Sequence, residues 1–391
     1  MLLDFANANV DCFTPTRKSG TASEDVLTRE NFAEAYSEIS SWEGYAPTPL
    51  HDLKELATSL NVKSILYKDE GPRFGLGSFK ALGGAYAAAR VLQRAVSRRT
   101  GQNVTLENIK NGDYAEEVSN LTLVTATDGN HGRSVAWGAG NFGAKCRIYI
   151  HAEVSAGRAK AMKDLDATIV RIDGDYDASV DLARTDAAKN GWFVVSDTTW
   201  EGYIDPPRDV MSGYGVITHE IVDTLETPPT HIFLQAGVGG LPAAISASLR
   251  QHYGTDSPRV IVVEPIQAAC LFASAQQGQA ATVKVEQESI MAGLSCGKTS
   301  PMAWEILCEE VSHFLTIPDD LAAPAMRFLG QLTPPITAGE SAVAGLAALV
   351  GAAQKPDLRE RLALNQDARI LLIGTEGATD PEIYKKIMAG A

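Results

Sequence analysis

The chain alternates short apolar runs with longer segments in which small apolar residues recur at helical spacing. Eight runs rich in Val, Ile and Leu have the length of strands and cover residues 64–70, 121–127, 145–151, 167–173, 192–198, 230–237, 259–265 and 368–377. Continuous apolar runs of this kind are typical of strands that helices cover on both faces. Ala-rich segments such as 79–96 and 155–166 lie between several of these runs and predict helices. The alternation predicts an α/β fold with a parallel sheet, interrupted at 98–120 by a polar surface insertion or a helix pair linking two lobes.

Composition and charge narrow the class of protein. With 391 residues, of which 45% are hydrophobic and 21% charged, the chain has the make-up of an ordinary globular protein with two domains or one large α/β unit. A net charge of −14 argues against a nucleic-acid partner, which favours a basic surface. No run approaches the roughly 18–20 apolar residues of a membrane helix, and the first residues lack the basic region of a signal peptide. Five cysteines without C-x-x-C spacing argue against a disulfide scaffold or a zinc site, so we expect no metal, no membrane contact and a cytoplasmic protein.

Candidate chemistry gathers in segments that follow the predicted strands, because parallel sheets bind ligands at the carboxyl ends of their strands. Lys80 comes just after a Gly-rich turn that follows the run at 64–70, and it lies beside Phe79 at the start of a helix of small residues. Removal from water at this position would favour the neutral amine that Schiff-base chemistry needs. The alternative is a surface lysine at a helix start, where the helix dipole disfavours a positive charge.

The other segments after strands are Gly-rich or polar. Residues 125–133 read TATDGNHGR and form a turn suited to an anion, although the turn carries its own carboxylate, Asp128. In residues 235–245, glycines at the start of a helix could present backbone N–H groups to a phosphate, but the segment lacks the lysine of a P-loop and the G-x-G-x-x-G spacing. Residues 374–380 add hydroxyls and carboxylates. Together with Lys80, these segments suggest pyridoxal phosphate, which needs partners for its aldehyde carbon, its phosphate and its ring nitrogen.

The chain resembles the fold-type II pyridoxal-phosphate enzymes, the group of threonine dehydratase and the tryptophan synthase β chain. Within that group it is most similar to the diaminopropionate ammonia-lyases. The motifs that carry the resemblance span residues 45–380 and read YAPTPL, KDEGPRFGLGSFKALGGAYA, TATDGNHGRSVAWGA, VVSDTTWEGY, LQAGVGG, IMAGLSCG, GESAVAGL and TEGATD. The resemblance implies two lobes, each with a mostly parallel sheet flanked by helices. We expect a large cofactor-binding domain of residues 1–85 and 200–391, and a small domain of residues 86–199.

The resemblance also implies the residues that bind the cofactor. Lys80 would form the Schiff base, and Asn130 would contact the phenolic oxygen. Thr375 would face the ring nitrogen, and such a neutral partner suits β-elimination better than transamination. The phosphate would lie against the turn of Gly237, Val238, Gly239 and Gly240. The chain departs from the ammonia-lyases at Gly77 and Ser78, where they read Asn-Ala, and this departure concerns the substrate rather than the cofactor.

Two carboxylates carry the expected substrate chemistry. By the resemblance, Thr127, Asp128, Gly129 and His131 belong to the loop that binds the substrate, and Asp128 stands where most enzymes of this fold type have a hydroxyl. Asp128 could act as a general base on the face opposite Lys80, or it could pair with an ammonium on the substrate's β-carbon; the alternative is a helix N-cap. Asp197 would lie near the substrate amino group or the leaving ammonia, although on its own it reads as a turn residue at a strand end.

These expectations define a function and its competitors. We expect α,β-elimination of a small amino acid, 2,3-diaminopropionate, to pyruvate and two ammonia by a cytoplasmic homodimer. The alternative is a serine, threonine or 3-hydroxyaspartate dehydratase of the same fold. A non-catalytic cofactor-binding protein is disfavoured by Lys80, Asn130 and the glycine turn. A nicotinamide oxidoreductase is disfavoured by the missing G-x-G-x-x-G after an early strand.

Overall fold

The computed structural model describes residues 5, 7–16, 22–127 and 129–390, and these form two compact units. The first, here called the large-sheet unit, comprises the described residues up to 32, residues 46–78 and those from 217 onward. The second, the small-sheet unit, comprises residues 33–45 and 79–216. Helices α2 (Arg29–Ile39) and α10 (Asp205–Thr224) contribute residues to both units.

The large-sheet unit contains a seven-stranded sheet in the order β1-β10-β9-β8-β11-β3-β2. Its strands are β1 (Asp11–Phe13), β2 (Leu50–Asp52), β3 (Ser64–Asp69), β8 (His231–Gln235), β9 (Arg259–Pro265), β10 (Val311–Ile317) and β11 (Arg369–Gly374). The five central strands are parallel, whereas β1 and β2 pair antiparallel at the two edges. The central strands β8, β9 and β11 are buried along nearly their whole length and are rich in Val, Ile and Leu, as strands covered on both faces are. The predicted mostly parallel α/β architecture is confirmed in this unit.

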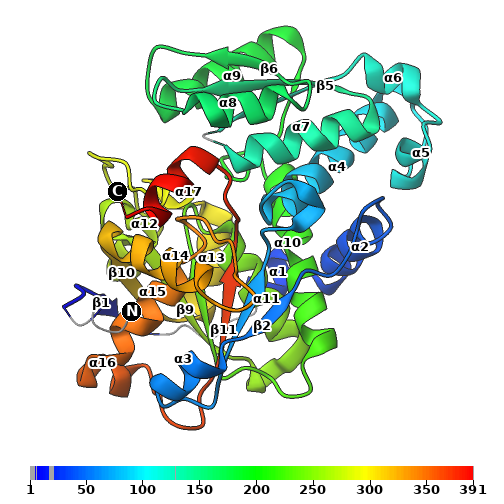
Figure 1. The fold of residues 1–391 in the computed structure, drawn as a ribbon. Coiled ribbons are helices and arrows are strands. Elements are labelled where there is room, and N and C mark those ends of the chain that lie inside the picture. Colours follow the sequence, from blue (N-terminus) through cyan, green and yellow to red (C-terminus); the bar gives the residue numbers. More distant parts are fainter. Residues whose placement is uncertain (1–4, 6, 17–21, 128, 391) are drawn as a thin grey trace. The chain divides into compact units, whose positions relative to one another are not determined.

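Helices cover this sheet and supply its core. They are α1 (Ala22–Val26), α3 (Lys54–Ser59), α11 (Gly240–Tyr253), α12 (Cys270–Gln277), α13 (Pro301–Glu310), α14 (Ala322–Gly330), α15 (Ala344–Ala353), α16 (Pro356–Arg361) and α17 (Pro381–Met388). α15 packs on β8, β9, β10 and β11 and is drawn in front of the sheet (Figure 1). A Cβ at Gly345 would lie 3.1 Å from the carbonyl oxygen of Phe233, so a glycine lets α15 approach β8 closely.

The small-sheet unit contains a four-stranded parallel sheet in the order β6-β5-β4-β7. Its strands are β4 (Thr122–Ala126), β5 (Lys145–Ile150), β6 (Thr168–Arg171) and β7 (Phe193–Val194), and its helices are α4 (Lys80–Thr100), α5 (Leu106–Lys110), α6 (Ala115–Ser119), α7 (Asn130–Phe142), α8 (Ala156–Lys163) and α9 (Tyr176–Asn190). α4 and α7 lie side by side (Figure 1). A Cβ at Gly138 of α7 would lie only 2.7 Å from the Cα of Ala85, so the small residues noted in both segments permit this close packing.

Each of the eight apolar runs contains a strand, although the run at 192–198 contributes only the two residues of β7. β10 does not stand out in the sequence because Ser312 and His313 interrupt its apolar pattern, yet both side chains are buried. The polar stretch 98–120 holds the end of α4 and the short helices α5 and α6. Among the described residues, no helix has both the length and the hydrophobicity needed to span a membrane.

Candidate active site

Lys80 is the first residue of α4 and pairs with a carboxylate. Its Nζ donates to Asp197 Oδ2 at 2.5 Å, and the two side chains are only 21% and 16% exposed. The Nζ also lies 5.5 Å from the ring centroid of Phe79 and 5.8 Å from that of Tyr214, and these two rings pack 4.7 Å apart. The pair is therefore largely removed from water and framed by aromatic rings that attract a cation.

The charges around Asp197 keep it ionised. Burial alone would raise the pKa of its carboxyl, but the charge of Lys80, followed by that of His131 and the hydrogen bond from Lys80, holds the pKa well below its usual range. Burial raises the pKa of nearby Tyr214 to about 12, against the opposing charge of Lys80. Asp197 is thus available as a permanent anion and Tyr214 as a neutral phenol. Tyr214 lies mid-helix in α10, and nothing in its sequence context marked it for this place.

The loop before α7 and the first turn of that helix hold three of the predicted substrate-binding residues. Thr127 is buried, and its hydroxyl accepts the N–H groups of Gly129 at 3.0 Å and Gly132 at 3.4 Å. His131 Nε2 lies 2.9 Å from the carbonyl oxygen of Val195; because a carbonyl only accepts, this nitrogen carries the proton. Asp128 itself lies outside the described residues.

The glycine turn after β8 is shaped by close packing. Gly239 has φ +103°, a conformation that L side chains rarely adopt, and it precedes the first residue of α11. A Cβ there would also lie 3.1 to 3.3 Å from the side chains of Leu271, Ala303 and Leu307. A Cβ at Gly237 would lie 2.9 Å from Cys296 Sγ. The turn thus requires glycine, and the first turn of α11 directs backbone N–H groups outward, as an anion site needs.

Two thiols flank this turn. Cys270 Sγ donates to the carbonyl oxygen of Gly237 at 3.6 Å, and burial raises the pKa of the Cys270 thiol above its usual range. Cys296 is also close to the turn, because its Sγ would lie 2.9 Å from a Cβ at Gly237. All five cysteines are free thiols in this structure.

Gln235, which the sequence analysis overlooked, connects the glycine turn to Thr375. Its Nε2 donates to the carbonyl oxygen of Ile373 at 2.7 Å, to that of Ala342 at 3.1 Å and to Thr375 Oγ1 at 3.1 Å. Both Gln235 and Thr375 are buried. A signal was available in the sequence, because Gln235 is a single amide at the end of the apolar run HIFLQ.

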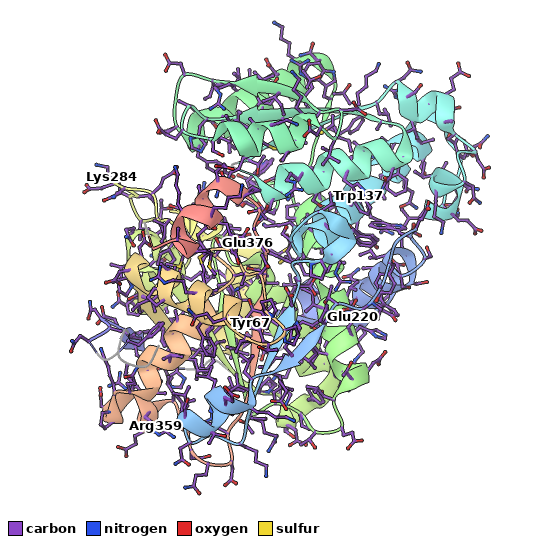
Figure 2. All side chains as sticks on the ribbon, in the orientation of Figure 1. Tyr67, Trp137, Glu220, Lys284, Arg359 and Glu376 are labelled. Carbon is purple, nitrogen blue, oxygen red and sulfur yellow. The ribbon has the colours of Figure 1, made fainter. Side chains whose placement is uncertain are left out.

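The loop that leads to Lys80 is bound to the loop after β11. Ser78 forms an antiparallel bridge with Glu376, and the N–H of Gly377 donates to the carbonyl oxygen of Gly77 at 2.9 Å. Gly77 has φ +81°. Glu376, labelled in Figure 2, is buried and accepts the N–H of Ser341 at 3.3 Å. Because β8, β11 and β3 are neighbours in the sheet, the three loops that follow them come together at one edge.

A buried charge network, here called the β3–α10 network, anchors the same loop. It consists of Thr48, Lys68, Glu70, Arg73 and Glu220, and the side chains of its four charged members are 3% exposed or less. Lys68 Nζ donates to Glu220 Oε2 at 2.6 Å, and Arg73 donates to Glu220 at 2.7 and 2.9 Å. Arg73 also donates to Glu70 at 2.8 and 2.9 Å. Two cations and two anions balance, so the network is neutral; Glu220 is labelled in Figure 2.

Known proteins match this chain along most of its length. A family model for pyridoxal-phosphate dependent enzymes matches residues 42–376. The chain is 40% identical over 354 residues to the diaminopropionate ammonia-lyase of Escherichia coli (strain K12), with 88% of each chain covered. It is 36% identical over 389 residues to that of Salmonella typhimurium, with 96% of each covered. The crystal structure of the E. coli ammonia-lyase in complex with D-serine has a TM-score of 0.88 at 36% identity over 97% of both chains. This chain therefore belongs to the family of pyridoxal-phosphate dependent enzymes, as its motifs predicted.

Proposed function

We propose that this protein is a 2,3-diaminopropionate ammonia-lyase. It removes the α-proton and expels the β-amino group as ammonia, and the aminoacrylate that leaves is hydrolysed to pyruvate and a second ammonia. One water is consumed, so the atoms balance. The observation that carries the proposal is the Lys80–Asp197 pair, a lysine amine held against an ionised and largely buried carboxylate, in a chain 40% identical to an ammonia-lyase.

The residues present fit pyridoxal phosphate. Gly237, Val238, Gly239 and Gly240 would hold its phosphate, since this turn needs glycine and precedes the N-terminus of α11. Lys80 would hold its aldehyde carbon and Asn130 its phenolic oxygen. Thr375 already accepts a hydrogen bond from Gln235, which leaves its own proton free to be donated to the ring nitrogen. When bound, the cofactor supplies an electron sink for the carbanion at the substrate's α-carbon.

The protein's own side chains would move the protons. Lys80 Nζ would take the α-proton of one enantiomer, and Asp128 that of the other from the opposite face. Asp197 would hold a cationic amine near the reaction, either that of Lys80 or the β-ammonium of the substrate. Thr127, Gly129 and His131 would bind the substrate carboxylate, with the N-terminus of α7 behind them favouring an anion.

The main competitor is a dehydratase of a hydroxy amino acid. Relatives named probable D-serine dehydratase are 22 to 26% identical to this chain. A hydroxy amino acid offers only one ammonium, however, whereas Asp128 and Asp197 provide two carboxylates. Diaminopropionate has a second ammonium for the second carboxylate, and we favour it for this reason.

A product ratio distinguishes the two functions. Purified holoenzyme is incubated with diaminopropionate, serine, threonine or 3-hydroxyaspartate, and both ammonia and keto acid are measured. We expect two ammonia per pyruvate from diaminopropionate and much slower release of one ammonia per keto acid from the others. Borohydride should attach the cofactor to Lys80. A preference for a hydroxy amino acid would reject the ammonia-lyase, and a label on another lysine would reject the site.

Asp128→Asn tests the second base. The variant keeps the size of the side chain and removes its basicity, so turnover of D-diaminopropionate should fall by about 10²–10⁴ while the L-enantiomer is largely spared. If Asp128 only binds the β-ammonium of the substrate, the variant should instead show a higher KM for both enantiomers. Asp164→Asn is a control, because its carboxylate pairs with Lys160 at the surface of the same unit. Near-normal kinetics for both enantiomers in Asp128→Asn would leave this residue as a helix cap.

We further propose that the enzyme is a cytoplasmic homodimer. Free thiols throughout the chain support a reducing compartment. The dimer rests on the family resemblance alone. Light scattering after gel filtration should give twice the mass of one chain, and a single-chain mass at micromolar concentration would reject it.

A further inference from the structure

The chain directly before Asp197 is held by specific hydrogen bonds within the small-sheet unit. The hydroxyl of Tyr203 donates to the carbonyl oxygen of Val194 at 2.9 Å and accepts the N–H of Ser196 at 3.0 Å. His131 Nε2 donates to the carbonyl oxygen of Val195 at 2.9 Å. A single phenol therefore spans the residues at which β7 ends, directly before Asp197.

Tyr203 is itself fixed by stacking rather than by burial in a core. Its ring lies parallel to that of Trp200, with centroids 3.8 Å apart and an interplanar angle of 4°. The guanidinium of Arg184 lies 4.3 Å from the Trp200 centroid, and it must occupy the opposite face because Tyr203 fills the first. Trp200, Tyr203 and Arg184 also line a cavity of about 920 Å³. Since Tyr203 borders open space, its stack and its two hydrogen bonds determine where its hydroxyl lies.

We propose that Tyr203 is a positioning residue that places Asp197 against Lys80 by bridging Val194 and Ser196. This inference rests on the function proposed above for Lys80 and Asp197. The contact is sensitive because Asp197 Oδ2 and Lys80 Nζ are only 2.5 Å apart. A displacement of about 1 Å in such a pair can cost on the order of 10²-fold in rate. In this role Tyr203 does not contact the reacting atoms, and its effect on the reaction passes through Asp197.

Tyr203→Phe tests the proposal because it keeps the ring stack and removes only the bridging hydroxyl. We expect kcat to fall by about tenfold, the effect of one to two lost hydrogen bonds, with KM changed little. Tyr149→Phe is a matched control in the same unit. Its hydroxyl donates to Asp186 Oδ2 at 2.5 Å, whereas that of Tyr203 donates to the backbone carbonyl of Val194 beside Asp197. The control should match Tyr203→Phe in thermal stability and keep wild-type kcat.

A pH titration of cofactor binding supplies a readout that a general loss of stability would not change. Among the described residues, the groups that lower the pKa of Asp197 by their charge are Lys80 on α4 and His131 on α7, and the phenol of Tyr214 on α10 lies nearby. Lys80 lowers the pKa of Asp197, so a looser pair raises that pKa toward its usual value. Absorbance then follows how much pyridoxal phosphate the cofactor-free protein takes up as the pH is lowered. In Tyr203→Phe, this uptake should be lost at a higher pH than in the wild type. Tyr149→Phe should follow the wild type.

A double-mutant cycle separates this inference from the proposed function. If Tyr203 acts through Asp197, the tenfold effect of Tyr203→Phe should disappear when Asp197 is already Asn. Equal effects in both backgrounds would overturn the positioning role, as would a wild-type kcat and pH profile in Tyr203→Phe. Wild-type activity in Asp197→Asn alone would instead reject the function proposed for Asp197.

Discussion

Removing one carboxylate from the β3–α10 network should destabilise the large-sheet unit severely. Glu220→Gln keeps the shape of the side chain and removes its charge. Lys68 and Arg73 then face only Glu70, so the buried network changes from neutral to a net charge of +1. Glu220 accepts hydrogen bonds from Lys68 and Arg73 at 2.6 to 2.9 Å. The amide offers one acceptor oxygen instead of two, so its NH₂ group must face a cationic donor.

The magnitude follows from the burial of the partners. The side chains of Lys68, Arg73 and Glu220 are 3%, 1% and 2% exposed, so water cannot solvate the charge that is left over. Breaking a buried pair in this way costs about 3–5 kcal/mol in the free energy of unfolding. With a urea dependence of roughly 3 kcal/mol per molar, the midpoint should fall by about 1–2 M. The loop that Arg73 anchors leads directly to Lys80, so cofactor occupancy should fall as well.

Urea unfolding, followed by both tryptophan fluorescence and circular dichroism, measures the effect. Glu382→Gln is the control: its pair with Lys385 is 77% and 71% exposed and should contribute about 0–1 kcal/mol. Burial would raise the pKa of Glu220, but hydrogen bonds and charge from Arg73, then Lys68, hold it below its usual value. A lowered pKa in the folded state means that the stabilisation is present above the unfolded pKa and is lost as the pH falls through the folded one. A midpoint shift no larger than that of Glu382→Gln would refute the reasoning.

Two further changes test other parts of the large-sheet unit. Gly239→Ala should weaken cofactor affinity about tenfold or more, because φ is +103° and a Cβ would lie 3.1 Å from Leu307. The control is Gly254→Ala at the other end of α11, where φ is +56° but the space is open, and its cofactor affinity should not change. Equal affinities of the two variants in equilibrium dialysis would contradict the assignment of this turn. Burial raises the pKa of Glu264 from 4.5 to about 8, so the folded state binds its proton more tightly than the unfolded state does. As the pH rises from about 4.5 to 8, the wild type should therefore lose stability relative to Glu264→Gln. A stability difference that does not change with pH in urea titrations would contradict the raised pKa.

The sequence predicted the fold and the glycine turn well because both depend on local patterns. Apolar runs mark the strands, and the loops that follow them carry the unusual residues. The partners of those residues could not be predicted in the same way. Glu220 bonds to Lys68 across 152 positions of the chain, and Lys68 lies within an apparently apolar strand. Charge networks of this kind depend on which segments the fold brings together, and no periodicity records them.

Asp197 illustrates the same limit within the site. Its carboxylate could be noted from the motif VVSDTTWEGY, but its partner Lys80 lies 117 residues earlier. Gln235 was recognisable as a polar residue in an apolar run, whereas Tyr214 offered no signal because a tyrosine on a helix is more often part of a core. Asp128 stays a prediction from the family motif.

The strand order of the large sheet determines how much of the chain must be synthesised before the cofactor site can form. Among the described residues β11 is the strand furthest along the sequence, yet it lies between β8 and β3. Until residues 369–374 have emerged from the ribosome, nothing joins β8 and its glycine turn to β3 and the loop before Lys80. The hydrogen bonds from Gln235 to Thr375 and from Gly377 to Gly77 form only then. A nascent chain therefore cannot assemble its cofactor site before β11 has been made, and capture of the vitamin-derived cofactor must wait for residues 369–374.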